Sequence, residues 1–121
     1  KYELMARQQF EFSVMRARAE ALANGTRVVF QTNTDGSVYK FGTDKLPFND
    51  PASYDQLIFS DSFKGDVKLT LNDTLIFNSR GYVVDQDDQL NSVSVTLKRK
   101  GKTFCTGTIY ATGFLDYSCN F

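Results

Sequence analysis

The sequence contains no histidine and no tryptophan, and it has only two cysteines and two prolines among 121 residues. Histidine is the usual general base and a common metal ligand, so its absence removes every Ser-His or Cys-His nucleophile arrangement. Two cysteines without histidine cannot complete a four-ligand zinc site. Acidic and basic residues balance at 14 each, so no overall field attracts nucleic acid or a membrane surface. These absences favour a protein that is not an enzyme and holds no cofactor.

Long apolar runs are also absent, since no segment offers the ~18 apolar residues that a membrane-spanning helix needs. The chain starts at Lys1 without a methionine and contains no signal peptide. We therefore expect that an N-terminal segment was removed ahead of it. The length and the 41% share of hydrophobic residues fit one folded domain with one core.

Residues 1–24 are predicted to form one helix, because they are rich in good helix formers and end at Asn24-Gly25, where both residues tolerate the left-handed conformation of a helix end. The helix has no N-cap and starts as though already in progress. One stripe at helical spacing is predicted to pack on the rest of the domain: Leu4, Gln8, Phe12, Met15, Ala19 and Leu22. A second, weaker stripe comprises Phe10, Val14, Ala17 and Ala21. This second stripe is either the edge of a wide core-facing surface or, in our working hypothesis, a contact surface for neighbouring subunits.

After Gly25 the apolar pattern changes to alternation, which predicts strands. The segment 42–54 contains both prolines and is predicted to be a long loop, and 85–89 is an acidic loop. A single helix followed only by strands predicts an α+β fold, with helix 1–24 packed on an antiparallel β domain of residues 25–121 as one structural unit. The predicted strands are 26–33, 38–41, 56–60, 67–71, 75–78, 82–84, 92–98, 103–110 and 114–118.

Cys105 and Cys119 allow two interpretations. They are two buried free thiols, or they form a disulfide that closes a loop of roughly 15 residues and stabilises the fold by about 3 kcal/mol. The alternating residues between them predict strands that could place them as neighbours. We favour the disulfide, which indicates the periplasm or the cell surface.

Two charged segments are candidate binding sites. Four cations lie within five positions at a predicted turn, namely Lys98, Arg99, Lys100 and Lys102. They suit either a solvated hairpin end or contact with DNA or another polyanion. Asp85, Asp87 and Asp88 are loosely spaced like calcium ligands. However, the sixth and twelfth positions from Asp85 are Leu90 and Thr96, where an EF-hand needs Gly and Glu, so a solvated acidic turn is favoured.

Two short motifs carry a family resemblance. The segment Arg16–Gly25 (RARAEALANG) contains an "A-R-x-E-A" stretch that runs into a polar stop and then the strand Arg27-Val28-Val29-Phe30. The segment Leu75–Val84 (LIFNSRGYVV) is similar to an "I-x-F-x-x-x-G" strand and turn, with Phe77 and Gly81 at matching positions. A turn at Gly81 also favours a positive φ there. With these motifs in this order, the chain resembles the H-type pseudopilin and FimU/FimT minor pilin family, lacking its N-terminal transmembrane segment.

The resemblance implies a type IV pilin-like fold, in which a single N-terminal helix packs on antiparallel β-sheets with a C-terminal disulfide. It implies a structural minor pilin that primes the assembly of a type IV pilus and lies at the filament tip. Its partners would be other minor and major pilins or pseudopilins, and the inner membrane through the missing helix. The expected location is the cell envelope: inner membrane and periplasm before assembly, then pilus or pseudopilus.

Three alternatives stay open. The first is an H-type pseudopilin of type II secretion. The second is a DNA-uptake pilin that uses the basic turn at 98–102, although Gly113-Phe114-Leu115-Asp116 lacks the arginines of the "G-R-x-R" motif with which such pilins often end. The third is a surface adhesin or ligand-binding module that uses the loop Gly42–Tyr54.

Overall fold

A computed structural model describes all 121 residues, and it begins with the predicted helix. The helix α1 spans Tyr2–Asn24 and ends at Gly25, whose φ of 61° and ψ of 30° are left-handed. The predicted helix and its glycine stop are therefore confirmed. No helix of this structure is both long enough and apolar enough to cross a bilayer.

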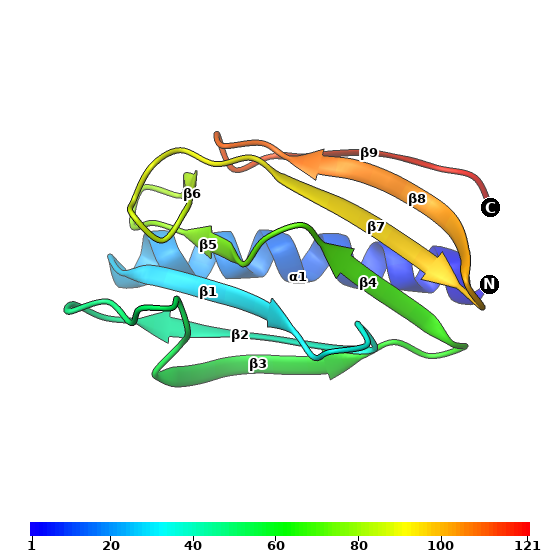
Figure 1. Cartoon of the computed structure of the whole chain (residues 1–121), viewed down its shortest axis with the longest axis horizontal. Coiled ribbons are helices and arrows are strands. Elements are labelled where there is room, and N and C mark those ends of the chain that lie inside the picture. Colours follow the sequence, from blue (N-terminus) through cyan, green and yellow to red (C-terminus); the bar gives the residue numbers. More distant parts are fainter.

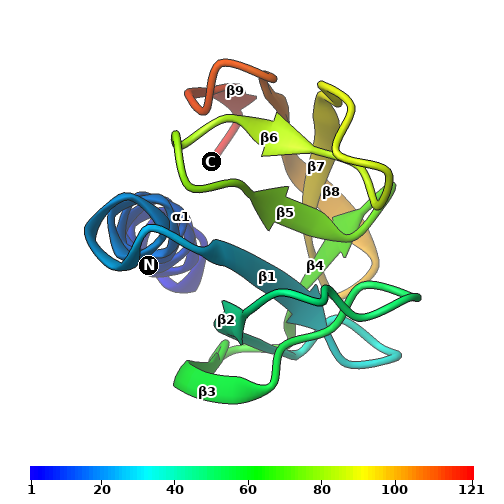
Figure 2. The ribbon, with the colours of Figure 1, turned by 90° about the vertical axis from the view of Figure 1, so that its left-hand side faces the viewer.

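Nine strands follow the helix, all paired antiparallel in two sheets (Figure 1). The five-stranded sheet has the order β3-β2-β1-β5-β6, and the four-stranded sheet has the order β4-β7-β8-β9. The view along the helix axis in Figure 2 shows α1 on one side, with the two sheets arranged around it. The strands are β1 (Arg27–Thr32), β2 (Val38–Asp44), β3 (Gln56–Ser62), β4 (Val67–Leu71), β5 (Leu75–Phe77), β6 (Val83–Val84), β7 (Val93–Arg99), β8 (Lys102–Ile109) and β9 (Leu115–Cys119).

One core of 21 buried residues joins α1 to both sheets. Its centre is aromatic: Phe30 stacks on Tyr39 and Phe41, with ring centroids 5.3 and 5.9 Å apart, and Phe10 meets Phe30 edge-on at 6.1 Å. Aromatic side chains bury more apolar area than any others and gain from such geometry. This cluster explains how a chain without tryptophan holds its helix on the sheets.

The two apolar stripes of the helix face the opposite sides from those predicted, since the stripe of Leu4, Phe12 and Met15 is exposed and the other is buried. Phe10, Val14, Ala17 and Ala21 are buried against the sheets, together with Ala6 and Ser13. The hypothesis that this stripe contacts neighbouring subunits is therefore wrong. The alanines bring the helix axis close to the sheets, and Phe10 and Val14 fill the remaining space. The bulkier stripe, with Phe12 and Met15, faces away from the core.

Two predicted boundaries also change. The loop predicted from residue 42 begins after Asp44, because Gly42, Thr43 and Asp44 continue β2 and pair with residues 27–29 of β1. Arg99 and Lys102 pair with each other as the last and first residues of β7 and β8, so only Lys100 and Gly101 form the turn. The alternating pattern predicted all nine strands, with differences of a few residues at their ends.

The two cysteines form a disulfide, as the favoured interpretation predicted. Cys105 of β8 and Cys119 of β9 are direct partners in the antiparallel ladder. β9 is an edge strand, and apart from this cross-link it is held by its pairing to β8 and its packing on the core. The disulfide therefore fastens the C-terminal strand to the domain.

Candidate subunit interface

The face of α1 that points away from the sheets carries five exposed large apolar residues. We call it the outer face; it comprises Leu4, Met5, Phe12, Met15 and Leu22. Phe12 and Met15 are 67% and 65% exposed, whereas Phe10 on the buried face is fully covered. Apolar surface gathered along one helix face indicates a contact site for another protein or a membrane. The outer face is therefore the first candidate for a functional surface.

A shallow groove of about 300 Å³ extends the outer face toward the four-stranded sheet. Its walls come from α1 and from the segment between β8 and β9, where Phe114 is 63% exposed. Six of the nine lining residues are hydrophobic, so the groove offers apolar surface continuous with the helix. The lining residues are Glu11, Val14, Met15, Arg18, Ala19, Leu22, Gly113, Phe114 and Leu115.

Arg18 holds this groove in shape. Its Nε donates a 2.9 Å hydrogen bond to the carbonyl oxygen of Gly81, and its guanidinium lies 5.1 Å from the centre of the Phe114 ring. Gly113 packs so closely that an added Cβ would lie 2.3 Å from the Gly81 oxygen and 2.5 Å from Arg18 Nε. Gly81 has the positive φ expected from the sequence, at 79°. Arg18 thus connects the helix to two loops at once, and Phe114 is presented from the second of them.

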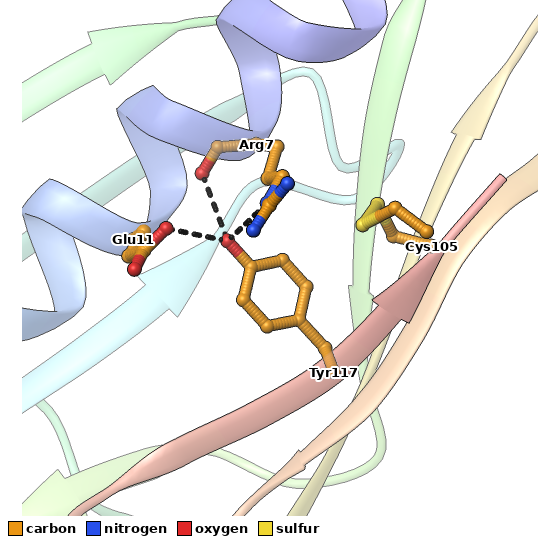
Figure 3. Close-up of a disulfide and its surroundings, with 5 residues drawn as sticks. Arg7, Glu11, Cys105 and Tyr117 are labelled. Carbon is orange, nitrogen blue, oxygen red and sulfur yellow. Dashed lines mark hydrogen bonds between the residues drawn. A yellow bond between two sulfur atoms is a disulfide. The ribbon is translucent and has the colours of Figure 1, made fainter. Parts of the chain in front are cut away.

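Tyr117 of β9 makes a second polar connection to the helix, close to the disulfide (Figure 3). Its hydroxyl accepts a 3.2 Å hydrogen bond from Arg7 Nε and donates one of 2.8 Å to Glu11 Oε2. Burial raises the pKa of the Tyr117 hydroxyl, and the bond from Arg7 opposes this shift without reversing it. The network lies between the buried and outer faces and fixes the orientation of the helix about its own axis.

The other flank of the helix is also polar. The Arg16 guanidinium lies 4.9 Å from the centre of the Phe59 ring, and the Gln9 side chain donates a 2.9 Å hydrogen bond to the Ser62 carbonyl oxygen. Polar side chains therefore border the outer face on both sides. An apolar centre with a polar rim is the usual composition of a protein–protein interface.

The two charged segments lie at opposite ends of the molecule. The basic residues Lys98, Arg99, Lys100 and Lys102 gather at the β7–β8 hairpin, where only Arg99 is partly buried. The acidic segment connects β6 to β7, and the Asp85 side chain accepts hydrogen bonds from the backbone nitrogens of Asp87 and Gln89. No group of three or more carboxylates or thiols is placed to hold a metal ion. DNA contact at the basic hairpin stays a prediction.

No protein-family model matches the sequence, and no curated protein matches it. Solved structures do match, and they define the class of the fold. One helix on antiparallel sheets, with a disulfide joining the last two strands, is the type IV pilin-like fold of minor pilins and pseudopilins. The predicted fold class is therefore confirmed.

Two crystal forms of the type IV minor pilin FimU from Pseudomonas aeruginosa superpose with TM-scores of 0.74 and 0.72, at 15% and 14% identity. Each covers 95% of this chain, and the matched parts are 87% and 91% of the FimU chains. The minor pseudopilin EpsH of the Vibrio cholerae type 2 secretion system superposes with a TM-score of 0.69 at 15% identity, covering 98% of both chains. At these identities the likeness establishes the fold.

Sequence reasoning missed the two polar connections of the helix, Arg18 to Gly81 and Tyr117 to Glu11. A signal for the first was present, because Arg18 lies in the "A-R-x-E-A" motif and Gly81 lies in the strand-and-turn motif. Each motif by itself predicts only local structure, whereas in the structure the two are in contact. No comparable signal marked Tyr117, since its partners are 106 and 110 residues away in the sequence.

Proposed function

We propose that this chain is the globular domain of a structural minor pilin, which joins a type IV pilus, primes its assembly and lies at the filament tip. The observation that carries the proposal is the outer face of α1. Phe12 and Met15 are about two-thirds exposed on a helix whose opposite face is buried against the sheets. The pilin-like fold supports the same role, because the similar structures are subunits of a pilus and of a secretion system.

In this proposal the outer face contacts the helices of neighbouring pilins, both minor and major, within the filament. The groove beside it, with Phe114 on its rim, accepts an apolar side chain from a neighbour. Before assembly, an apolar helix ahead of Lys1 holds the subunit in the inner membrane, with the domain in the periplasm. The disulfide is consistent with that oxidising compartment. The role is structural and requires no catalytic residue.

A second candidate is an H-type pseudopilin of type II secretion. It is favoured by the superposition on the pseudopilin EpsH, which covers 98% of each chain. The same outer face would then contact other pseudopilins, so the structural argument is shared. Deleting the gene distinguishes the two candidates. Loss of surface pili with normal secretion would support the minor pilin, and loss of secretion with normal pili would support the pseudopilin.

The test of the shared argument changes the outer face while preserving the buried one. We expect the double variant Phe12→Ser/Met15→Ser, introduced into the gene in its native host, to abolish filament assembly or protein secretion. The isolated domain should unfold at an unchanged temperature, since exposed side chains away from the core contribute little to stability.

The matched control is Leu57→Ser/Leu90→Ser, which removes two apolar residues of similar exposure, 51% and 68%, away from the helix. It should assemble normally. Normal assembly of the Phe12→Ser/Met15→Ser variant, with wild-type amounts of protein in the envelope, would contradict the proposed role of the outer face.

A further inference from the structure

The charges of this neutral chain are separated along the helix axis. The end at which α1 begins carries seven basic and four acidic side chains, and we call it the basic end. The opposite end is formed by the start of β1, the end of β2, the turn 78–82 and the loops 45–55 and 85–89. It carries six acidic side chains, Asp44, Asp50, Asp55, Asp85, Asp87 and Asp88, and three basic ones, Arg27, Lys45 and Arg80. The basic residues of the basic end are Lys1, Lys64, Lys68, Lys98, Arg99, Lys100 and Lys102, and its acidic residues are Glu3, Asp35, Asp61 and Asp66.

Specific contacts gather these residues from distant parts of the sequence. Arg99 Nε donates a 2.9 Å hydrogen bond to the Gly65 carbonyl oxygen, and its guanidinium lies 5.1 Å from the centre of the Tyr2 ring. The Lys100 backbone nitrogen donates to the Asp66 carbonyl oxygen at 3.2 Å. The β7–β8 hairpin, the β3–β4 loop and the start of α1 thus meet at one end, as Figure 1 shows.

Like charges face one another across the ladder of this end. Lys68 of β4 is the direct partner of Lys98 of β7, an arrangement that destabilises an antiparallel pair. The one ion pair nearby joins Lys68 Nζ to Asp35 at 3.8 Å, between side chains that are about half exposed. Lys98, Lys100 and Lys102 have no carboxylate within 4.0 Å. Their positive charge is therefore available to a partner outside the chain.

The turn itself places charge where a different residue would fit the backbone better. Lys100 has a positive φ of 52° and is followed by Gly101 at 77°. Two-residue hairpin turns of this kind favour Asn or Asp at the first position. A lysine there, beside the Lys68–Lys98 pair, places positive charge where neither the turn nor the ladder favours it.

We propose that the basic end binds the surface of an anionic phospholipid bilayer. This inference rests on the proposed function, in which a membrane anchor continues from the start of α1 and so brings this end to the bilayer before assembly. Basic clusters beside an anchor bind anionic headgroups, and the attraction decays within a Debye length of the surface. Repulsion of the acidic opposite end would keep α1 upright on the membrane, with its outer face open to incoming subunits.

Two other anionic partners are less suited to this surface. A single nucleic-acid strand gains from aromatic side chains that are free to stack on its bases. The run 98–102 has none, and the ring of Tyr2 beside it already lies 5.1 Å from the Arg99 guanidinium. The acidic end of a second copy has the right sign, but it also carries Lys45 and Arg80 beside its largest groove. Neither partner accounts for the position of the charge at the start of the helix, whereas a bilayer does.

The test uses the 121-residue chain and vesicles of phosphatidylcholine, with or without phosphatidylglycerol, in co-sedimentation at low salt. We expect binding only to the vesicles that contain phosphatidylglycerol, and release at about 1 M salt, where the Debye length is ~3 Å. The variant Lys98→Gln/Lys100→Asn/Lys102→Gln should bind at least about tenfold more weakly. It leaves Arg99 in place and relieves like-charge repulsion, so it should be at least as stable as the wild type.

The matched control Lys40→Gln/Lys45→Gln/Arg80→Gln removes the same charge elsewhere and should bind as the wild type does. Equal binding to both kinds of vesicle, or unchanged binding by the hairpin variant, would overturn the proposal. So would tighter binding to duplex DNA at equal phosphate concentration, or salt-sensitive self-association without vesicle binding. A failure here leaves the role of the outer face intact, because filament assembly by the Phe12 and Met15 variant is measured separately.

Discussion

The two faces of α1 are both apolar, yet only one belongs to the core. The buried face relies on small residues and one aromatic ring: Ala17 and Ala21 allow close approach, and Phe10 meets Phe30 edge-on. The outer face has larger side chains, with Phe12 and Met15 exposed and Ser13, between them in sequence, buried. Apolar bulk alone therefore does not identify which side of a helix packs on its own domain. The side that packs on the domain is the one that approaches the sheets closely, and small residues such as alanine mark that side.

The largest expected difference in stability is between two variants, each of which lacks one phenylalanine ring of α1. Phe10→Ala should lower the free energy of unfolding by about 3–5 kcal/mol, because it leaves a cavity beside Phe30. Phe12→Ala should change it by less than about 0.5 kcal/mol. Urea unfolding followed by circular dichroism measures both variants.

Equal destabilisation by the two substitutions would mean that the outer face contributes to the core of the isolated domain. The comparison would then fail, and with it the assignment of Phe12 to contacts between subunits. A matched pair of phenylalanines, two positions apart on one helix, keeps helix propensity the same in both experiments.

The sequence predicted the elements better than it predicted which surfaces meet. Alternation and glycine stops gave the helix, the strand order along the chain and the hairpin at 98–102, because these signals are local. The stripe assignment failed because both stripes follow the helical period. Periodicity reports that a face is apolar but not what covers it. The contact between Arg18 and Gly81 was missed although both lie in recognisable motifs, since each motif predicts only local structure and a guanidinium at a helix surface usually faces solvent.

A smaller effect is expected at the border between the faces, where Gly113 packs against Gly81 and Arg18. Gly113→Ala places a Cβ 2.3 Å from a backbone oxygen at a φ of 99°. Gly101→Ala has a similar positive φ of 77° but open space around the added atom, so it measures the backbone cost alone, about 1–2 kcal/mol. Gly113→Ala should exceed that cost by about 1–3 kcal/mol through overpacking.

Thermal unfolding of the two glycine variants gives this difference directly. If they are equally destabilised, the close packing of Gly113 is not needed to hold the loop against the helix. Phe114 would then be presented independently of Arg18, and the groove beside the outer face would have no fixed wall.

The smallest expected effect concerns the one polar contact on the buried face. The hydroxyls of Ser13 and Tyr39 lie 2.7 Å apart, and burial raises the pKa of Tyr39 above its usual value of about 10. A raised folded-state pKa gives stability that is complete below the unfolded-state pKa and is lost as pH rises through the folded-state pKa. The free energy of unfolding should therefore be independent of this group near pH 7 and decrease above about pH 10.

Tyr39→Phe should reduce the alkaline decrease by the share that Tyr39 contributes. Ser13→Ala should retain the decrease while lowering stability at neutral pH by about 1 kcal/mol through the lost hydrogen bond. Tyr117, whose pKa is also raised, remains in both variants, so the difference between them isolates the buried face. An unchanged alkaline slope in Tyr39→Phe would show that the folded domain does not protect this hydroxyl from titration. The outer face contributes no group to this contact, so Phe12→Ala should leave the dependence of stability on alkaline pH as it is in the wild type. This measurement distinguishes the two faces of the helix without relying on packing.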